Sequence, residues 1–312
     1  MLDNLGLDVT LYERVGTPQP LGSGIILQPT GLRILHELGL GSAIASAGNR
    51  IEHLVGHTAP SLRRVLNVNY SALAGDYHGV AIHRGALFEV LFGEVARRDL
   101  PIITECEVNS IEALRAFDLV VDASGAGSLL RHHASPATRI RSLKFGALWG
   151  NFDWPGAPFR KDCLEQRYVA AHTMIGVLPI GTGLNGTKEK VAFFWSLPNS
   201  AYESWCADGL EAWKSQVLGI WPETAGILDQ ITNGAEMTMA RYSHHTMRVP
   251  YSGNIAHIGD AAHATSPQLG QGANMALLDA WALGNAIERS NNLQEALPDY
   301  AASRRRHVRG FQ

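Results

Sequence analysis

Apolar residues recur in two spacings along the first third of the chain, and each spacing predicts a different element. Residues 7–13 alternate between apolar and polar side chains, which is typical of a strand, and this strand would end on Glu13. Apolar positions at helical spacing predict a helix that Thr30 caps and Gly39 ends. A further helix is expected to open at residues 83–91.

The rest of the chain alternates between strand signals and helical stretches. The run at 118–122 predicts a buried strand that enters a turn. From about 141 to 241, strand-like runs are rich in aromatic residues, and one helix is expected over 204–218. An apolar strand at 254–258 then precedes a glycine-rich loop and an apolar helix over about 273–287.

The stretch from Gly259 to Asn274 carries the most chemical information. Asp260 follows the strand, and Gly270 and Gly272 stand just before the helix. A carboxylate at the C-terminal end of a strand can accept hydrogen bonds from ligand hydroxyls. Glycines before a helix let a ligand lie against bare backbone, where free N–H groups point at it. The pattern predicts a ligand site; a buried helix after a glycine-rich turn is the alternative.

The order and spacing of this stretch closely resemble the second FAD-binding motif of the flavin-dependent aromatic hydroxylases, the p-hydroxybenzoate hydroxylase-like or UbiH-like monooxygenases. The resemblance implies an α/β fold with a Rossmann-type FAD domain and an inserted, mostly antiparallel β-sheet substrate domain. The FAD domain would comprise 1–50, 81–140 and 242–312, and the substrate domain 51–80 and 141–241. The family's first strand and its GxGxxG turn would lie before the start of this chain, and its last helices beyond the end.

The same resemblance implies roles for individual residues. Asp260 would bind the ribityl chain of FAD, and Pro267 would form a dry wall beside the reactive side of the flavin. Backbone N–H groups from Leu269 to Asn274 would stabilise the negative charge that reduction places on the flavin. The cofactor-binding residues implied here are Gly259, Asp260, Pro267, Gly270, Gln271, Gly272, Ala273 and Asn274, and Pro267 is the implied catalytic contact.

Further cofactor contacts are implied elsewhere in the chain. Glu13, with Arg14 beside it, would hold the ribose hydroxyls of the adenosine from the tip of a strand, although a plain surface carboxylate is the alternative. Arg84 resembles the arginine of the family's Arg-x-x-Leu element near the ribityl phosphate; a surface arginine is the alternative. Gly125 belongs to a turn that would face FAD. Ser124 precedes it where the family usually has aspartate, so coupling to the nicotinamide cofactor is in doubt.

Two other patterns invite a different interpretation. Residues 181–186 spell GxGxxG after an apolar run, but another strand follows instead of a helix. Because that motif binds pyrophosphate only with a helix N-terminus behind it, the segment is predicted to be a hairpin loop. The histidine pairs at 132–133 and 244–245 do not predict a metal site, because adjacent side chains point apart and no carboxylate stands at ligand spacing.

Composition narrows the class of protein. The 312 residues are 46% apolar and 18% charged, with a net charge of −3 spread along the chain, which argues against a nucleic-acid partner or an anionic membrane. Three widely spaced cysteines suit a reducing cytoplasm, and no apolar run approaches the roughly 20 residues of a membrane span. The protein is therefore expected to be cytoplasmic. The basic cluster at 304–309 is expected to be a solvated helix face.

The predicted function is that of an FAD-dependent monooxygenase. The resemblance implies hydroxylation of a small aromatic substrate with O₂ and with NAD(P)H as a transient co-substrate, through a flavin C4a-hydroperoxide. Two alternatives stay open. The chain could be a flavoprotein reductase or dehydrogenase without oxygen insertion, or a truncated, non-catalytic flavin-binding remnant.

Overall fold

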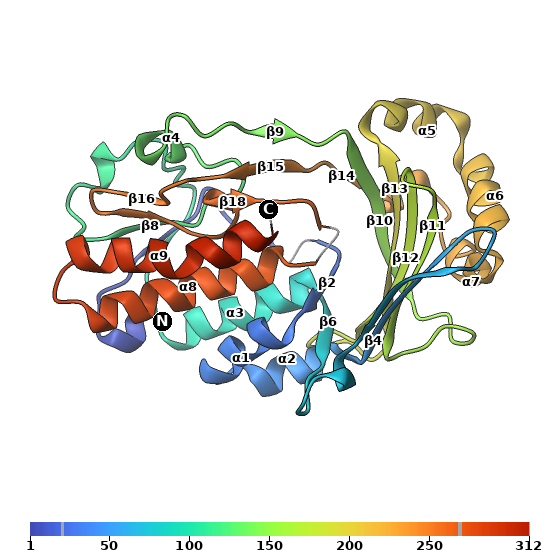
Figure 1. The fold of residues 1–312 in the computed structure, drawn as a ribbon, viewed down its shortest axis with the longest axis horizontal. Helices are drawn as coiled ribbons and strands as arrows, with labels where there is room; N and C mark the ends of the chain where they lie inside the picture. Colours follow the sequence, from blue (N-terminus) through green and yellow to red (C-terminus); the bar gives the residue numbers. More distant parts are fainter. Residues whose placement is uncertain (20–21, 268–269, 312) are drawn as a thin grey trace.

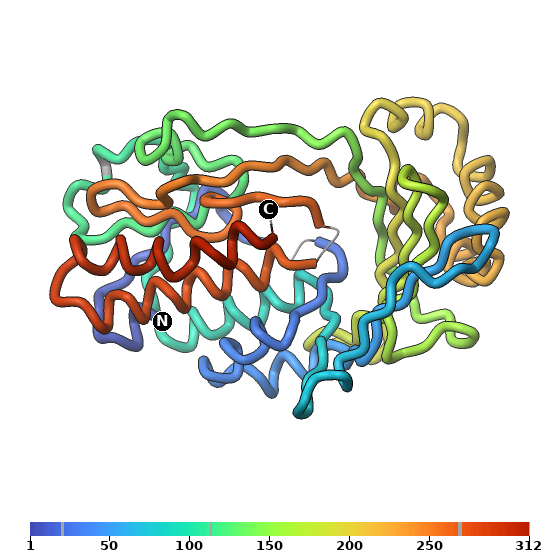
Figure 2. The backbone as a smooth tube through the Cα atoms, viewed as in Figure 1, coloured from blue at the N-terminus to red at the C-terminus, as the bar shows by residue number. Residues whose placement is uncertain are grey.

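A computed structural model describes residues 1–19, 22–267 and 270–311. Two portions lie side by side, one in which long helices pack on small sheets and one built around a single large sheet (Figure 1). The chain passes between them more than once, in its blue, green and orange segments (Figure 2). The sequence therefore builds each portion from segments that are far apart along the chain.

The strands of the helical portion are short, and they pair in both parallel and antiparallel fashion. Strand β1 (Leu11–Tyr12) pairs with β7 (Ile102–Ile103), while β8 (Val120–Asp122) pairs with β17 (Ile255–His257), which β16 (Tyr251–Ser252) flanks. Strand β15 (Ser243–Thr246) lies between β18 (His263–Ala264) and β9 (Arg141–Ser142). The strand expected over 7–13 is only two residues long, because the described pairing with β7 extends over just two positions.

A fourth small sheet lies beneath three helices. Strands β2 (Gly24–Leu27) and β3 (Asn49–Ile51) flank β6 (Gly79–His83). Helices α1 (Pro29–Glu37), α2 (Gly41–Ala47) and α3 (Arg84–Arg97) pack on it through buried aliphatic side chains. Helix α1 starts at Pro29 and not after a Thr30 cap, because the fixed φ of proline suits a first helical turn.

Two long helices, α8 (Gly272–Arg289) and α9 (Leu293–Phe311), pack against each other at the end of the chain. The expectation that the basic cluster is a solvated helix face is wrong for Arg304, which is buried and paired with Asp279 of α8. Arg304 follows the buried Leu297 and Tyr300 at helical spacing and so lies on the packed face of α9. Arg305, Arg306 and Arg309 are exposed.

The second portion contains a seven-stranded sheet in the order β14-β10-β13-β12-β11-β4-β5. Its strands are β4 (His53–Thr58), β5 (Arg64–Asn69), β10 (Phe145–Asp153), β11 (Cys163–Val169), β12 (Thr173–Gly181), β13 (Lys190–Pro198) and β14 (Thr238–Ala240). All neighbours are antiparallel except β4 and β11, so a mostly antiparallel sheet is confirmed.

The two faces of this sheet have different partners. Phe193 and Trp195 face an apolar core that includes Trp213 and Trp221, from α6 (Leu210–Ile220) and the turn after it. Ala192, on the opposite face, packs with Ile26 of β2. We call this second face the inner face, because it is the one that meets the helical portion.

The helix expected over 204–218 is two helices, α5 (Tyr202–Asp208) and α6. Gly209 separates them at φ +87° and ψ 153°, a conformation that only glycine adopts readily and that ends α5. The apolar spacing of the sequence continues through this residue, which is why it predicts one helix. A four-residue helix, α7 (Ala225–Leu228), completes this layer.

The GxGxxG segment is the hairpin loop between β12 and β13, as predicted. The N–H of Gly183 donates to the carbonyl of Ala47 over 3.0 Å, so the loop satisfies the C-terminal end of α2. Gly181 has φ +74°, and a Cβ atom placed there would lie 2.6 Å from the carbonyl oxygen of Gly48. The glycines therefore let the loop dock on a helix C-terminus, the opposite polarity to a phosphate-binding turn.

Gly181→Ala is expected to destabilise the protein more than Gly183→Ala. Both residues have positive φ, so either substitution introduces backbone strain of about 1–2 kcal/mol. Only position 181 adds a clash with rigid backbone, whereas nothing lies within 4 Å of a Cβ at position 183. Urea unfolding of both variants measures the difference; equal losses would show that the close approach to α2 does not constrain the loop.

Within the described ranges, no helix combines the length and the apolar character that crossing a membrane requires.

Candidate functional site

Asp260 lies in a short 3-10 turn, η7 (Gly259–Ala261), directly after β17. Its side chain is accessible, and no described residue donates a hydrogen bond to its carboxylate. Desolvation by the surrounding protein raises the pKa of Asp260, and the nearby charges of His263 and Arg84 partly oppose that rise. An exposed carboxylate with free acceptor capacity suits a ligand that carries hydroxyl groups.

The N-terminus of α8 is open beside this turn. Gln271 is the N-cap residue and makes no side-chain cap, and the first intrahelical bond runs from the N–H of Met275 to its carbonyl over 2.8 Å. Gly270 has φ +58°, and among the described residues no atom lies within 4 Å of a Cβ placed at Gly270 or Gly272. Gly272 and Ala273, the first two residues of α8, are only partly buried, so their N–H groups suit an electron-rich ligand edge.

Asn274 has a different role from its neighbours. Its side chain is fully buried and donates to the carbonyls of Ile26 (3.0 Å) and Gly270 (3.1 Å), while its Oδ1 accepts from the N–H of Gln28 (2.8 Å). Gly31 leaves room for it, since a Cβ there would lie 2.3 Å from that Oδ1. The amide therefore ties β2 to the start of α8, and because the whole residue is buried, the predicted contact of Asn274 with a cofactor stays a prediction.

The turn that carries Gly125 follows β8. Asp122, at the end of β8, accepts from the N–H and hydroxyl of Ser124, the hydroxyl of Ser128 and the ring of His257. Burial alone would raise the pKa of Asp122, but these hydrogen bonds outweigh it and hold the pKa well below its usual range. Gly125 has φ +84° with nothing within 4 Å of a Cβ, so this turn also presents open backbone.

Arg131, which the sequence patterns did not single out, joins these two turns. It is buried, and its guanidinium donates to the carbonyls of Ala261 (2.8 Å), Gly125 (3.2 Å) and Ala126 (2.8 Å). In the sequence, Arg131 directly follows two leucines. This pattern could have indicated a basic residue on a packed helix, here α4 (Arg131–Ala134).

Arg84 lies at the first position of α3 and is exposed, with its N–H bonded to the carbonyl of Ser23 over 2.8 Å. The structure brings its charge close enough to Asp260 to oppose, in part, the rise in the pKa of that carboxylate that desolvation causes. A Cβ at Gly22 would lie 2.9 Å from the side chain of Arg84, so the preceding loop runs closely over it. Arg84 and Asp260 therefore belong to one charged surface.

Glu13 and Arg14 follow β1. Glu13 is half-buried, and its Oε1 accepts from the N–H of Val15 over 2.9 Å. Arg14 is exposed and lies 3.9 Å from Glu107. Neither side chain has a described contact with Asp260 or Arg84, so their predicted place at the adenosine end of the cofactor stays a prediction.

Pro267 is exposed, and its carbonyl accepts from the N–H of Gly270 over 2.8 Å. It lies at the start of the loop that leads into α8. The predicted backbone donor Leu269 lies outside the described residues, as does part of the loop before Gly22. The role of Pro267 as a wall beside the flavin stays a prediction.

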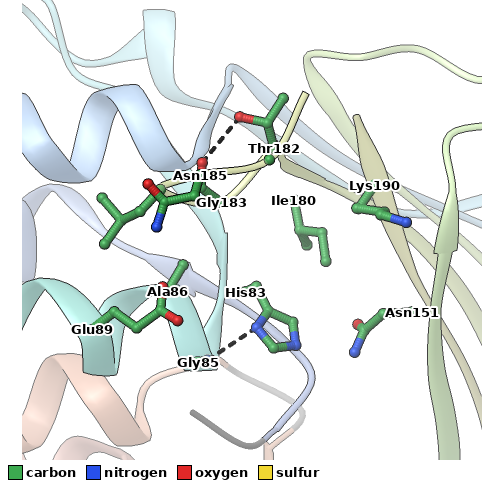
Figure 3. Close-up of a pocket in the computed structure, with 13 residues that line it drawn as sticks. His83, Gly85, Ala86, Glu89, Asn151, Ile180, Thr182, Gly183, Asn185 and Lys190 are labelled. Carbon is green, nitrogen blue, oxygen red and sulfur yellow. Dashed lines mark hydrogen bonds between the residues drawn. The ribbon is translucent and has the colours of Figure 1, made fainter. Parts of the chain in front are cut away.

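A cavity of about 440 Å³ lies between the inner face of the sheet and the first turn of α3. Figure 3 shows His83 and Glu89 on the α3 side, Asn151 and Lys190 on the sheet side, and the GxGxxG loop above. His83 accepts from the N–H of Gly85 and so caps α3. The cavity is thus a mixed polar and apolar pocket at the junction of the two portions, where small-molecule sites commonly occur.

These features fit FAD, although each is modest alone. A carboxylate with free acceptors suits ribityl hydroxyls, an uncapped helix N-terminus suits the electron-rich flavin edge, and an exposed arginine suits a phosphate. Asp260, the start of α8 and Arg84 supply these groups on neighbouring elements. For the metal alternative, the described residues contain no group of three or more histidine, cysteine, aspartate or glutamate side chains that could hold an ion.

Comparison with known proteins agrees with this assignment. The FAD-dependent urate hydroxylase of Klebsiella pneumoniae is 24% identical over 331 residues, which cover 99% of this chain and 82% of that protein. The 3-amino-4-hydroxybenzoate 2-monooxygenase of Streptomyces cremeus is 26% identical over 324 residues, covering 97% and 79%. The crystal structure of P. aeruginosa PqsL with 2-aminobenzoylacetate matches with a TM-score of 0.84 at 20% identity, covering 99% of this chain and 88% of PqsL.

The likeness to PqsL confirms the predicted p-hydroxybenzoate hydroxylase-like fold. A family model described as "FAD binding domain" matches residues 105–311, which include the Gly125 turn, η7 and both final helices. The predicted cofactor, FAD, is confirmed at the level of the family. Because this match spans well over half of the sequence, the chain belongs to the FAD binding domain family.

Proposed function

We propose that the protein is an FAD-dependent monooxygenase that uses NAD(P)H and O₂ to hydroxylate a small aromatic compound. The observation that carries this proposal is the joint presence of the Asp260 turn, the open start of α8 and Arg84 beside a junction cavity. Relatives over nearly the whole chain, named as hydroxylases of urate and of aminohydroxybenzoate, support the same reaction class.

The chain's own residues would perform binding, orientation and exclusion of water. Bound FAD supplies the redox chemistry by accepting electrons from the nicotinamide and activating oxygen. Asp260 would accept hydrogen bonds from the ribityl hydroxyls, and Arg84 would neutralise phosphate charge. The N–H groups that start α8 would stabilise negative charge on the flavin ring, and Pro267 would keep water from its reactive side.

The substrate would bind on the inner face of the seven-stranded sheet. Trp149 pairs with Phe194 across β10 and β13, on the same face as Asn151 and Ala192, so two half-buried aromatic rings and an amide share this surface. The 440 Å³ cavity continues that face toward α3. A flat ring with polar substituents suits such a surface, and residues 51–80 and 141–241 would form the substrate domain.

The direct test is turnover by the FAD-loaded protein. A panel of small aromatic hydroxy and amino acids is expected to include compounds that speed NAD(P)H oxidation and appear as products heavier by one oxygen atom. Mass spectrometry with labelled O₂ identifies the source of that atom. Rapid NAD(P)H oxidation that never yields an oxygenated product would instead support a reductase or dehydrogenase.

Asp260→Ala is expected to weaken FAD binding about tenfold to a hundredfold and to leave the melting temperature of the cofactor-free protein nearly unchanged. The reason is that the carboxylate has no described hydrogen-bond donor of its own, whereas hydrogen bonds to a charged group contribute about 1.5–3 kcal/mol each. Fluorescence titration with FAD, alongside thermal unfolding without it, measures both quantities. A lower melting temperature with unchanged FAD affinity would show that Asp260 only shapes the turn.

A further inference from the structure

Two buried side chains of opposite charge hold the turn that carries Asp260. At its first residue, the N–H of Gly259 donates to Oδ2 of Asp279 on α8 over 2.8 Å. At its last residue, the carbonyl of Ala261 accepts from Nε of Arg131 over 2.8 Å. A carboxylate thus holds one end of η7 and a guanidinium holds the other.

Asp279 itself is immobilised. It is fully buried; Oδ2 also meets Nε2 of His263 at 2.6 Å, and Oδ1 accepts from Nε of Arg304 at 2.6 Å. The turn lies directly on α8, since a Cβ at Gly259 would be 3.0 Å from that of Ala276. Four elements, namely β18, η7, α8 and α9, therefore converge on one carboxylate.

Arg131 is equally restricted. In the part of the chain that the structure describes, its guanidinium forms no ion pair and bonds only to backbone carbonyls. Burial lowers the pKa of Arg131, which reflects the cost of keeping a cation there. The carbonyls it bonds belong to η7 and to the Gly125 turn, so this one side chain fixes the spacing between the two turns that face the cofactor.

Burying these charged groups costs desolvation free energy, which offsets much of the stability that their interactions provide. Replacing buried ionic groups with apolar side chains is often neutral or stabilising, so a fixed geometry is the better explanation for them. We propose that Asp279 and Arg131 are positioning residues, which hold η7 so that the Asp260 carboxylate is already placed for the cofactor before FAD binds. The proposal rests on the assignment of Asp260 as an FAD ligand.

The test is a double-mutant cycle on FAD affinity in the full chain. Asp279→Asn keeps the size of the side chain but removes its charge, and is expected to weaken FAD binding about tenfold to a hundredfold, as loss of orienting partners does at other ligand sites. If Asp279 acts through Asp260, the Asp279→Asn change should have little further effect in an Asp260→Ala background. Full additivity of the two losses would overturn the proposal.

Arg131→Lys provides a second route, in case Asp279→Asn folds poorly. The lysine keeps the charge but lacks the planar fork that reaches three carbonyls, so FAD affinity is expected to fall, again only when Asp260 is present. Amide hydrogen exchange of residues 259–261 in the FAD-free protein is expected to become faster in either variant, which reports the loosened turn without using activity. Unchanged exchange together with unchanged affinity would contradict the proposal.

Thr224→Val is the matched control for lost stability. Thr224 is fully buried in the sheet portion, and its hydroxyl donates to the carbonyl of Trp221 over 2.7 Å, far from η7 in the sequence. It is expected to lower the melting temperature and leave FAD affinity unchanged. If the single substitution Asp260→Ala does not weaken FAD binding, the assignment of Asp260 to the cofactor site fails. If Asp260→Ala weakens FAD binding but the Asp279 and Arg131 variants do not, the positioning role fails.

Discussion

Asn274→Ala is expected to lower the free energy of unfolding by about 2–4 kcal/mol and to weaken FAD binding at the same time. The substitution leaves the N–H of Gln28 and the carbonyl of Ile26 without their partner, and a buried group that loses its hydrogen bond costs about 1–3 kcal/mol. It also frees β2 from the start of α8, where the N–H groups proposed to face the flavin lie. Urea unfolding and FAD titration of one preparation measure both effects.

Asn274→Asp separates the hydrogen bonds from the packing. The carboxylate has the same shape and can still accept from Gln28, but it can no longer donate to the carbonyls of Ile26 and Gly270. We expect a loss at neutral pH at least as large as that of the alanine variant. Asn151→Ala is the control, because Asn151 is half-buried and donates over 3.2 Å to a single carbonyl. Wild-type stability of Asn274→Asp would mean that the donor bonds do not tie β2 to α8.

The period of apolar residues predicts several elements of the fold, and two of its failures have identifiable causes. The helix at 272–289 lies close to its predicted position, and the strands at 145–153 and 190–198 lie within the aromatic-rich stretch that was expected to form strands. The break at Gly209 and the burial of Arg304 depend on backbone conformation and on a charged partner in another helix. Such tertiary effects override local propensity and do not appear in the spacing of apolar residues.

The residues of the candidate site also fall into two classes: those that a local sequence pattern identifies and those that depend on the fold. Asp260 and the glycines before α8 stand in one contiguous stretch, so a local pattern is enough to identify them. Arg131 meets Ala261 from 130 positions away in the sequence, and Asp279 stands in what looks like an ordinary helix until the fold brings Gly259 and His263 to it. Residues proposed to contact the cofactor are therefore easier to predict from sequence than those proposed to position them.

Below pH 6.5 the protein is expected to lose stability through His245, by up to about 3 kcal/mol between pH 6.5 and 4. His245 lies on β15 with 1% of its surface exposed, and burial, followed by the charge of Arg131, lowers its pKa from 6.5 to about 4. The unfolded chain therefore binds a proton in this window that the native state does not, so stability falls as the pH falls. Each unit of pKa difference corresponds to about 1.4 kcal/mol.

His245→Leu removes the group that titrates and is expected to flatten the stability profile between pH 6.5 and 4, whatever its effect at neutral pH. Chemical unfolding at half-unit steps of pH, without FAD, measures the slope in this window. His244→Leu is the matched control, because it removes the adjacent, more accessible imidazole of the same strand, and it should keep the wild-type slope. A His245→Leu profile as steep as that of the wild type would show that other groups cause the acid loss and that the burial of His245 has no part in it.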